Sequence, residues 1–234
     1  MKFISDIIDF LAPKLCPGCG RTVLSEGEEM CAECLAECDV LPEKRCPRCG
    51  GPADGLLDEC GLCQLEEEDR PWKQAVSVFP FAGKARQWIH EFKYRDKLYL
   101  APFLADSLAD AWRKYGNSEK IDGIVPVPLH WLRRFMRGYN QTEVLADHLG
   151  RRLGLPTVCC LKRSRYTRQQ ARMNKEERRR NIRHAFVCRK SPAGLRLLLL
   201  DDVFTTGSTL KAAATALLDG GAAAVSVLTI ARDL

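Results

Sequence analysis

Hydrophobic residues in the later two-thirds of the chain occur as short continuous runs, separated by longer stretches with helical spacing. The runs predict strands at 75–81, 121–127, 157–161, 196–203 and 223–230. The stretches between them predict helices at 84–94, 99–115, 140–153 and 207–219. Apolar strands that alternate with helices are typical of a mostly parallel sheet covered on both faces. We therefore expect an α/β fold for this part of the chain.

The first 70 residues follow a different pattern. Residues 1–11 predict a short amphipathic helix, whose apolar face either packs on the protein or lies on a membrane surface. The polar run 66–71 ends in proline and is typical of a linker. We expect a small cysteine-rich module over 1–70 and a larger domain over 71–234.

The distribution of charge sharpens this division. Residues 1–70 hold 7 Lys or Arg and 16 Asp or Glu, a net charge of −9, whereas the other 164 residues carry 29 and 14, a net charge of +15. A content of 46% apolar and 28% charged residues is typical of a globular protein. No apolar run approaches the roughly 20 residues that a transmembrane helix needs, and the N-terminus does not resemble a secretory signal. We therefore expect a cytoplasmic protein.

Four Cys-x-x-Cys pairs lie within the first module. In a cytosolic protein such pairs more often bind metal than form disulfides, and two pairs complete a tetrahedral thiolate site. Eleven residues separate the first two pairs and ten separate the last two, which predicts two tandem zinc sites. The expected ligands are Cys16, Cys19, Cys31 and Cys34 for one site and Cys46, Cys49, Cys60 and Cys63 for the other.

Structural disulfides, free thiols and an iron–sulfur cluster are the alternatives for these cysteines. A site with four thiolates leaves no open position for water, so its role is structural. A module this short buries little core, and bound metal would supply folding energy. Cys38 is left over and has no predicted role.

The predicted strand 196–203 ends in two adjacent carboxylates, and a short loop of hydroxyl residues then opens a helix. Asp201 and Asp202 offer acceptors for the vicinal hydroxyls of a ribose. The loop presents backbone N–H groups at a helix start, where phosphate binds well. Its residues are Thr205, Thr206, Gly207, Ser208 and Thr209. The pattern favours a ribose 5-phosphate site; the alternative is a metal-binding Asp pair followed by a threonine helix cap.

This segment resembles the 5-phosphoribosyl-1-diphosphate (PRPP) motif of type I phosphoribosyltransferases. Further similar stretches are 125–128, 137–141, Thr167 with Gln170, Arg178 with Asn181, and 185–186. Together with the cysteine pairs, this order resembles the ComF competence family, which includes DNA-utilisation proteins. The resemblance implies a phosphoribosyltransferase-type sheet preceded by zinc modules, and a role in the uptake or use of external DNA.

The resemblance also implies roles for individual residues. Asp201 and Asp202 would hold the ribose hydroxyls of PRPP, the 205–209 loop its 5′-phosphate, and Mg²⁺ would accompany the pyrophosphate. A second loop would contact the pyrophosphate, although its arginines are equally typical of a solvated helix face. The residues of that loop are Val127, Pro128, Leu129, His130, Arg133 and Arg134. Lys93 lies in another similar stretch, 93–96, where it either approaches the active site or ends a surface helix.

Residues 151–190 hold 14 Lys or Arg and 2 Asp or Glu, so they carry +12. The resemblance places here a flexible loop that closes over the substrate. A run of this kind also fits a nucleic-acid backbone, or it is simply solvated. The residues singled out for these contacts are Thr167, Gln170, Arg178, Arg179 and Arg180.

Two functions remain open from the sequence. The first is a phosphoribosyltransferase whose acceptor is unknown and for which we identify no general base. The second is an accessory protein that binds single-stranded DNA and uses the phosphoribosyl site to sense PRPP or to bind a 5′-phosphate. The family link also suggests a competence helicase or another DNA-uptake protein as a partner of the zinc module.

Overall fold

The computed structural model describes residues 15–21, 30–53, 58–65, 70–94, 97–116, 120–129, 138–163 and 185–234. Four strands form one sheet in the order β1-β6-β5-β2. Their bounds are Ala75–Pro80 (β1), Gly123–Pro126 (β2), Arg196–Phe204 (β5) and Ala224–Arg232 (β6). All three pairings are parallel, which confirms the expected fold class.

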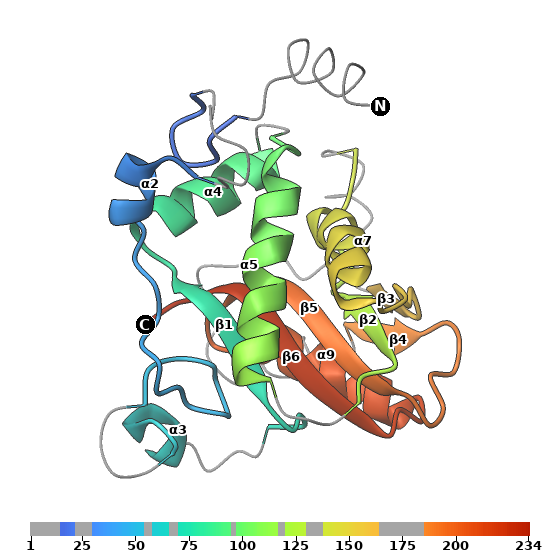
Figure 1. Cartoon of the computed structure of the whole chain (residues 1–234). Helices are drawn as coiled ribbons and strands as arrows, with labels where there is room; N and C mark the ends of the chain where they lie inside the picture. Colours follow the sequence, from blue (N-terminus) through green and yellow to red (C-terminus); the bar gives the residue numbers. More distant parts are fainter. Residues whose placement is uncertain are drawn as a thin grey trace, which may run out of the picture.

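Helices cover both faces of this sheet. One face carries α4 (Gly83–Tyr94), α5 (Leu100–Tyr115) and α7 (Gln141–Leu153), and the opposite face carries α9 (Ser208–Asp219). Figure 1 shows α5 in front of the sheet and α9 behind it. The four predicted helices therefore form within one or two residues of their expected bounds. Among the described residues, no helix is long and apolar enough to cross a membrane.

Strand β5 shows why both faces need a cover. Leu197 to Leu200 are all completely buried. Because side chains alternate along a strand, Leu198 and Leu200 join the hydrophobic cluster under α4, α5 and α7, whereas Leu197 and Leu199 join the cluster under α9. The run of four leucines is thus divided equally between two cores.

The predicted strand at 157–161 is wrong. Only Thr157 pairs with the sheet, through an isolated parallel bridge to Ile124. The Cys160 amide then donates to the Val158 carbonyl at 3.0 Å, and this tight turn takes the chain away from the sheet edge. A separate antiparallel pair follows, β3 (Leu161–Arg163) with β4 (Phe186–Cys188), and it packs against α9.

The cysteine-rich part contributes to both cores. It contains two short helices, α2 (Ala32–Ala36) and α3 (Gly61–Leu65). Cys16 and Cys34 belong to the cluster under α4 and α5, whereas Cys46, Cys49 and Cys63 belong to the cluster under α9. The Ala75 amide at the start of β1 donates to the Pro47 carbonyl at 2.7 Å, so the second cysteine group is joined directly to the edge of the sheet. The predicted helix at 1–11 lies outside the described residues.

Candidate functional site

The carboxyl ends of β2 and β5 lie next to each other at one edge of the sheet. From β2 the chain passes through α7 on one face and returns outside β2 at Thr157, whereas from β5 it passes through α9 on the other face to β6. In a parallel sheet, ligands bind in the crevice where the direction of the connections reverses. The topology therefore places a binding crevice between the loops that follow β2 and β5, and both loops were predicted to bind phosphate groups.

The two carboxylates lie within β5, because the strand extends past the expected end at residue 203 to Phe204. β2 stops pairing with β5 at Leu200, so Asp201 and Asp202 lie just beyond the last β2 contact. By strand alternation, Asp202 lies on the α4 face and Asp201 on the α9 face. Asp201 and Asp202 therefore place one carboxyl group on each face of the sheet, at the carboxyl end of β5.

Lys93 forms an ion pair with Asp202. Its Nζ lies 2.6 Å from Asp202 Oδ2, and the two side chains are only 20% and 19% exposed. Of the two alternatives for Lys93, the structure selects the one in which this residue approaches the candidate site. Lys93 lies in the last turn of α4, and residues far along the chain hold this turn at the site.

Residues at the start of α7 hold that last turn. The Tyr139 hydroxyl donates to the Phe92 carbonyl at 2.9 Å, and Gln141 Nε2 donates to the Lys93 carbonyl at 3.2 Å. The Tyr-Asn-Gln sequence was singled out by resemblance without a role. The structure gives it one, because it fixes the helix end that carries Lys93.

Asp201 has an unusual ionisation equilibrium. Burial, together with the neighbouring charge of Asp202, raises the pKa of Asp201 to about 7, although the charges of Lys93 and Arg163 act in the opposite direction. A carboxyl group in this setting binds a proton near neutral pH and accepts or donates hydrogen bonds accordingly. Perturbation by both burial and a partner charge is typical of a binding site.

Asp201→Asn is expected to raise the melting temperature more at pH 8 than at pH 6. The folded pKa of Asp201 lies above its unfolded value, so the native state holds a proton that the unfolded state lacks, and stability falls as pH rises through about 7. The amide cannot ionise, so the variant escapes that loss. Thermal unfolding at the two pH values measures the difference.

Asp202→Asn is the matched control for this prediction. It leaves the Lys93 ammonium without its partner at 2.6 Å, so we expect a lower melting temperature at both pH values. A lower melting temperature for Asp201→Asn at pH 8 would contradict the assigned pKa shift.

The predicted phosphate loop forms the turn between β5 and α9. Gly207 caps the helix with φ of +76°, a left-handed conformation that side-chain-bearing residues rarely adopt. Thr206 Oγ1 accepts from the Ser208 amide at 3.4 Å and lies 2.9 Å from Ser208 Oγ. The first turn of α9 thus begins at a left-handed glycine and gathers two hydroxyl groups at the helix start, where unpaired backbone amides favour a phosphate.

The loop after β2 is described from Val127 to Leu129. The Val127 carbonyl accepts from Thr142 Oγ1 at 2.7 Å and from Asn140 Nδ2 at 3.4 Å. The start of the predicted pyrophosphate loop is therefore held against the start of α7. Three of its predicted contact residues, His130, Arg133 and Arg134, lie outside the described residues.

The arginine-rich segment 151–190 is described only at its two ends, residues 151–163 and 185–190. The first part ends in β3, and the second contains β4. Arg163 ends β3, and its charge acts on Asp201, as noted above. Cys188 Sγ at the end of β4 donates to the Ala216 carbonyl of α9 at 3.2 Å. The segment therefore leaves and rejoins the fold on the α9 side of the site. Its predicted contact residues are all outside the described part of the chain: Thr167, Gln170, Arg178, Arg179 and Arg180.

The predicted metal ligands gather in two groups of four. Within each group the sulfur atoms lie within 4.8 Å of one another, a spacing that suits four thiolates around one zinc ion. We call these the first site (Cys16, Cys19, Cys31, Cys34) and the second site (Cys46, Cys49, Cys60, Cys63). Burial raises the pKa of Cys34 and of Cys63 to about 12, and zinc binding to such thiols releases their protons.

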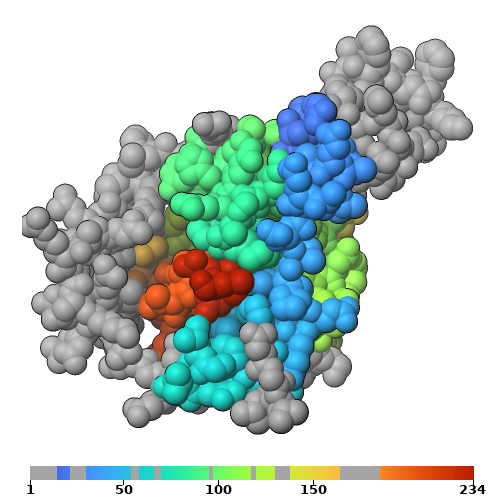
Figure 2. Space-filling view, turned by 90° about the vertical axis from the view of Figure 1, so that its left-hand side faces the viewer, coloured from blue at the N-terminus to red at the C-terminus, as the bar shows by residue number. Residues whose placement is uncertain are grey.

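Figure 2 shows how the candidate site and the second cysteine group face the same side of the molecule. The orange-to-red part of the chain, which contains β5, α9 and β6, reaches the surface between the green part above it and the cyan segment 58–65 below it. In this view the carboxyl-terminal part of the chain therefore lies between the green part and the segment 58–65, which carries two ligands of the second site.

Comparison with known families agrees with this geometry. The phosphoribosyl transferase domain family matches residues 140–234, and the double zinc ribbon domain family matches residues 7–64. The second match covers both four-cysteine sites, so they are the two structural zinc sites of a double zinc ribbon rather than iron–sulfur ligands or disulfides.

Relatives match over most of the chain. The DNA utilization protein YhgH of Escherichia coli K12 is 32% identical over 226 residues, which cover 95% of this chain and 98% of that protein. The protein of that name in Salmonella typhimurium is 34% identical over 193 residues, covering 81% of this chain and 84% of its own. Competence protein F of Haemophilus influenzae is 30% identical over 210 residues, covering 87% and 90%. The chain therefore belongs to the ComF/YhgH family of competence and DNA-utilisation proteins.

Proposed function

We propose that this protein binds PRPP with Mg²⁺ at the edge of its sheet and acts, in the cytoplasm, in the uptake or use of external DNA. The observation that supports the proposal best is the arrangement around β5. Two carboxyl groups at the end of β5 precede a turn whose amides open α9, and this turn lies next to the carboxyl end of β2. Carboxylates suit ribose hydroxyls, and a helix start suits the 5′-phosphate.

In the enzymatic form of this proposal, the phosphoribosyl group passes from PRPP to an acceptor and pyrophosphate is released. Asp201 and Asp202 would hold the sugar, with Lys93 orienting Asp202. The loop that begins at Val127 would hold the pyrophosphate together with Mg²⁺, which would neutralise the charge that develops on that group.

A calorimetric titration with PRPP and Mg²⁺ tests the site. We expect saturable binding by the parent protein and at least a 100-fold loss in the Asp201→Ala/Asp202→Ala double variant, because two hydrogen bonds to charged acceptors are worth roughly 3 kcal/mol or more together. Release of pyrophosphate in the presence of candidate acceptors measures turnover.

Asp122→Asn is the matched control. Asp122 directly precedes β2, at the amino ends of the strands and thus opposite the candidate site. Its carboxylate pairs there with Arg196 at 3.2 Å. Its replacement removes a carboxylate from the same pair of strands without touching the crevice, so PRPP affinity should not change. Absence of PRPP binding by the parent protein would refute the proposal.

A second candidate function is binding of single-stranded DNA by the arginine-rich segment, with a DNA-uptake helicase as a partner. The net charge of +12 over 151–190, whose described ends lie beside the site, favours it. Affinity should then fall steeply with salt. Neutralising Arg178, Arg179 and Arg180 should weaken binding and reduce the salt slope, whereas neutralising Arg113 and Lys114 at the end of α5 should not. Unchanged affinity in the triple variant would exclude these arginines as the contact.

A further inference from the structure

The two zinc ribbons begin with the same turn. In the first knuckle (residues 16–21) the Gly20 amide donates to the Cys16 carbonyl at 2.8 Å, and in the second knuckle (residues 46–51) the Gly50 amide donates to the Cys46 carbonyl at 2.8 Å. Both glycines have positive φ, 73° and 70°. The Cys16 and Cys46 amides donate to the carbonyls at the sixth position of each knuckle. Arg21 and Gly51 are therefore structurally equivalent residues.

The equivalent residues differ in what they offer the cysteines. In the first knuckle, Arg21 Nε donates to Cys19 Sγ at 3.3 Å. In the second knuckle, Gly51 has no side chain, and the space beside it is taken by Arg232 from the end of β6. A Cβ atom at Gly51 would lie 3.5 Å from Cys49 Sγ, 3.5 Å from Arg232 Cγ and 3.6 Å from Arg232 Nε. An arginine therefore lies beside each knuckle. In the first knuckle it is Arg21 of the knuckle itself, and in the second it is Arg232 of β6.

Arg232 also holds the start of the phosphate loop. Its Nη1 donates to the Phe204 carbonyl at 3.1 Å and to the Thr205 carbonyl at 2.7 Å. Its guanidinium carbon lies 4.7 Å from the centre of the Phe204 ring, and the residue is only 9% exposed. The residues that accept these bonds come directly before Thr206 and Gly207, so one buried side chain lies beside Gly51 of the second knuckle and is hydrogen-bonded to the start of the loop.

A second connection runs in parallel. Trp72 Nε1 donates to the Arg48 carbonyl of the second knuckle at 2.9 Å, and the Trp72 ring meets the Phe204 ring edge-on at 5.9 Å between centroids. Cys16 and Cys34 of the first site pack in the other hydrophobic cluster, together with α4 and α5. Among the described residues, the contacts that reach the loop from the zinc ribbons thus come from the second one.

We propose that Arg232 is a positioning residue through which the second zinc ribbon sets the conformation of the phosphate loop. Its guanidinium fixes the carbonyls of Phe204 and Thr205, so that the amides of the following turn face the ligand. The second zinc ribbon is thereby part of the phosphoribosyl site, whereas the first stabilises the opposite core. This inference rests on the proposed function, since it assigns a further residue to the same site.

Arg232→Met and Arg232→Lys test the proposal with ribose 5-phosphate as the probe in calorimetry. We expect at least a tenfold loss of affinity for methionine and a smaller loss for lysine, which retains a donor. Hydrogen exchange of residues 204–209 should be faster in Arg232→Met without any ligand present. Bound zinc per chain should remain that of the parent.

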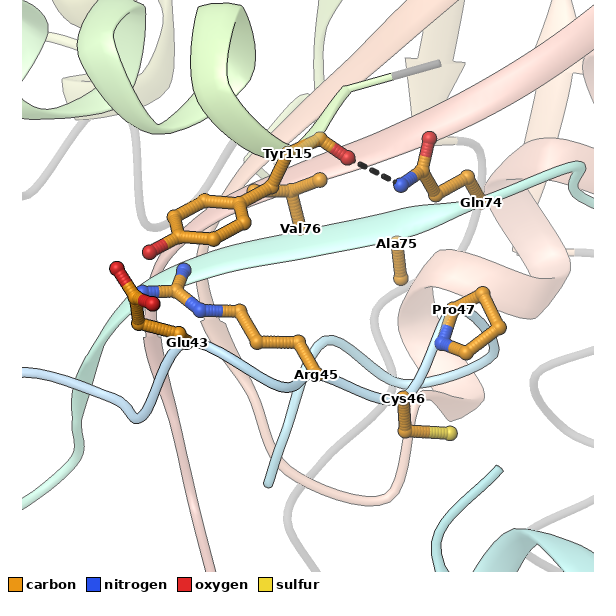
Figure 3. A pocket seen from close by; sticks show the side chains of 8 residues that line it. All are labelled: Glu43, Arg45, Cys46, Pro47, Gln74, Ala75, Val76 and Tyr115. Carbon is orange, nitrogen blue, oxygen red and sulfur yellow. Dashed lines mark hydrogen bonds between the residues drawn. The ribbon is translucent and has the colours of Figure 1, made fainter. Parts of the chain in front are cut away.

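Arg45→Met is the matched control. Arg45 also lies in the second zinc ribbon and is also held by backbone carbonyls, with Nη2 donating to the Leu41 carbonyl at 3.1 Å and Nε to the Pro42 carbonyl at 2.9 Å. Figure 3 shows its guanidinium against the Tyr115 ring, and the distance to the ring centre is 3.8 Å. This variant should lose stability while retaining phosphate affinity and exchange at 204–209.

Gly51→Leu and Arg21→Leu form a second pair that changes the equivalent position of each knuckle. The leucine at 51 would press on Arg232 and weaken binding of ribose 5-phosphate, whereas the leucine at 21 would leave it unchanged. Parent-like affinity and exchange in both Arg232→Met and Gly51→Leu would overturn the proposal, as would an equal effect of Arg45→Met. If the parent protein binds neither PRPP nor ribose 5-phosphate, the proposed function fails, and the exchange rates still decide the role of Arg232.

Discussion

Replacement of Cys49 by serine is expected to unfold the chain at 37 °C. Cys49 is only 2% exposed and lies in the hydrophobic cluster that also contains Phe204 and Val227 of the sheet. Structural zinc contributes roughly 10–16 kcal/mol of apparent binding free energy in small zinc modules, and a whole domain is stable by only about 5–15 kcal/mol. The free energy lost with this metal would therefore exceed the free energy of unfolding of the domain, because the ribbon and the sheet share one core.

Near-ultraviolet circular dichroism and metal content measure this effect. We expect Cys49→Ser to carry one zinc ion or none and to show no cooperative thermal transition. Cys38→Ser is the control, because Cys38 lies in the same part of the chain but outside both four-cysteine groups. It should retain two zinc ions and melt within a few degrees of the parent. Cooperative melting of Cys49→Ser near the parent temperature would show that the second zinc ribbon folds independently of the sheet.

Gly207→Val is expected to weaken binding of ribose 5-phosphate and PRPP by at least 100-fold. Gly207 has φ of +76°, which a β-branched residue adopts only under strain. A Cβ atom there would also lie 3.0 Å from the Phe204 ring and 3.3 Å from Arg70 Nη1. The turn must therefore move, and the amides at the start of α9 would no longer converge on one phosphate.

Gly154→Val separates this effect from backbone strain. Gly154 caps α7 with φ of +67°, and nothing lies within 4 Å of the position of its Cβ. This variant carries comparable strain away from the crevice, so it should cost about 1–2 kcal/mol of stability and leave phosphate affinity unchanged. Calorimetry on both variants at a temperature where both are folded gives the comparison. Equal losses of affinity would mean that the loop does not bind the phosphate.

Several features of this protein follow from patterns that extend over only a few residues. The continuous leucines of β5 predict a strand buried on both faces, and the paired cysteines predict their own partition into two sites. The Asp-Asp-x-x-Thr-Thr-Gly order predicts a turn at Gly207 that opens a helix. Each of these signals lies within one element or one turn, where local geometry decides the outcome.

Other features have no local signal. The predicted strand at 157–161 has the right composition, but a turn at Val158 and Cys160 takes it from the sheet after one bridge. The strand β4 was missed because it is only three residues long and pairs with β3 alone. The sequence pattern predicted two modules divided near residue 70. It gave no sign that the second zinc ribbon shares a hydrophobic core with the sheet.

The sequence by itself determined the α/β class, the eight zinc ligands and the loop from Thr205 to Thr209, because strand burial, metal spacing and helix capping depend on neighbouring residues. The tertiary structure alone decided that Lys93 meets Asp202 and that Arg232 lies between the second knuckle and the loop from Thr205 to Thr209. Those contacts join residues from different elements, and they arise from strand order and register. Parallel pairing of β5 with β6 places Phe204 opposite Arg232, and the crossing of α4 brings Lys93 to the end of β5.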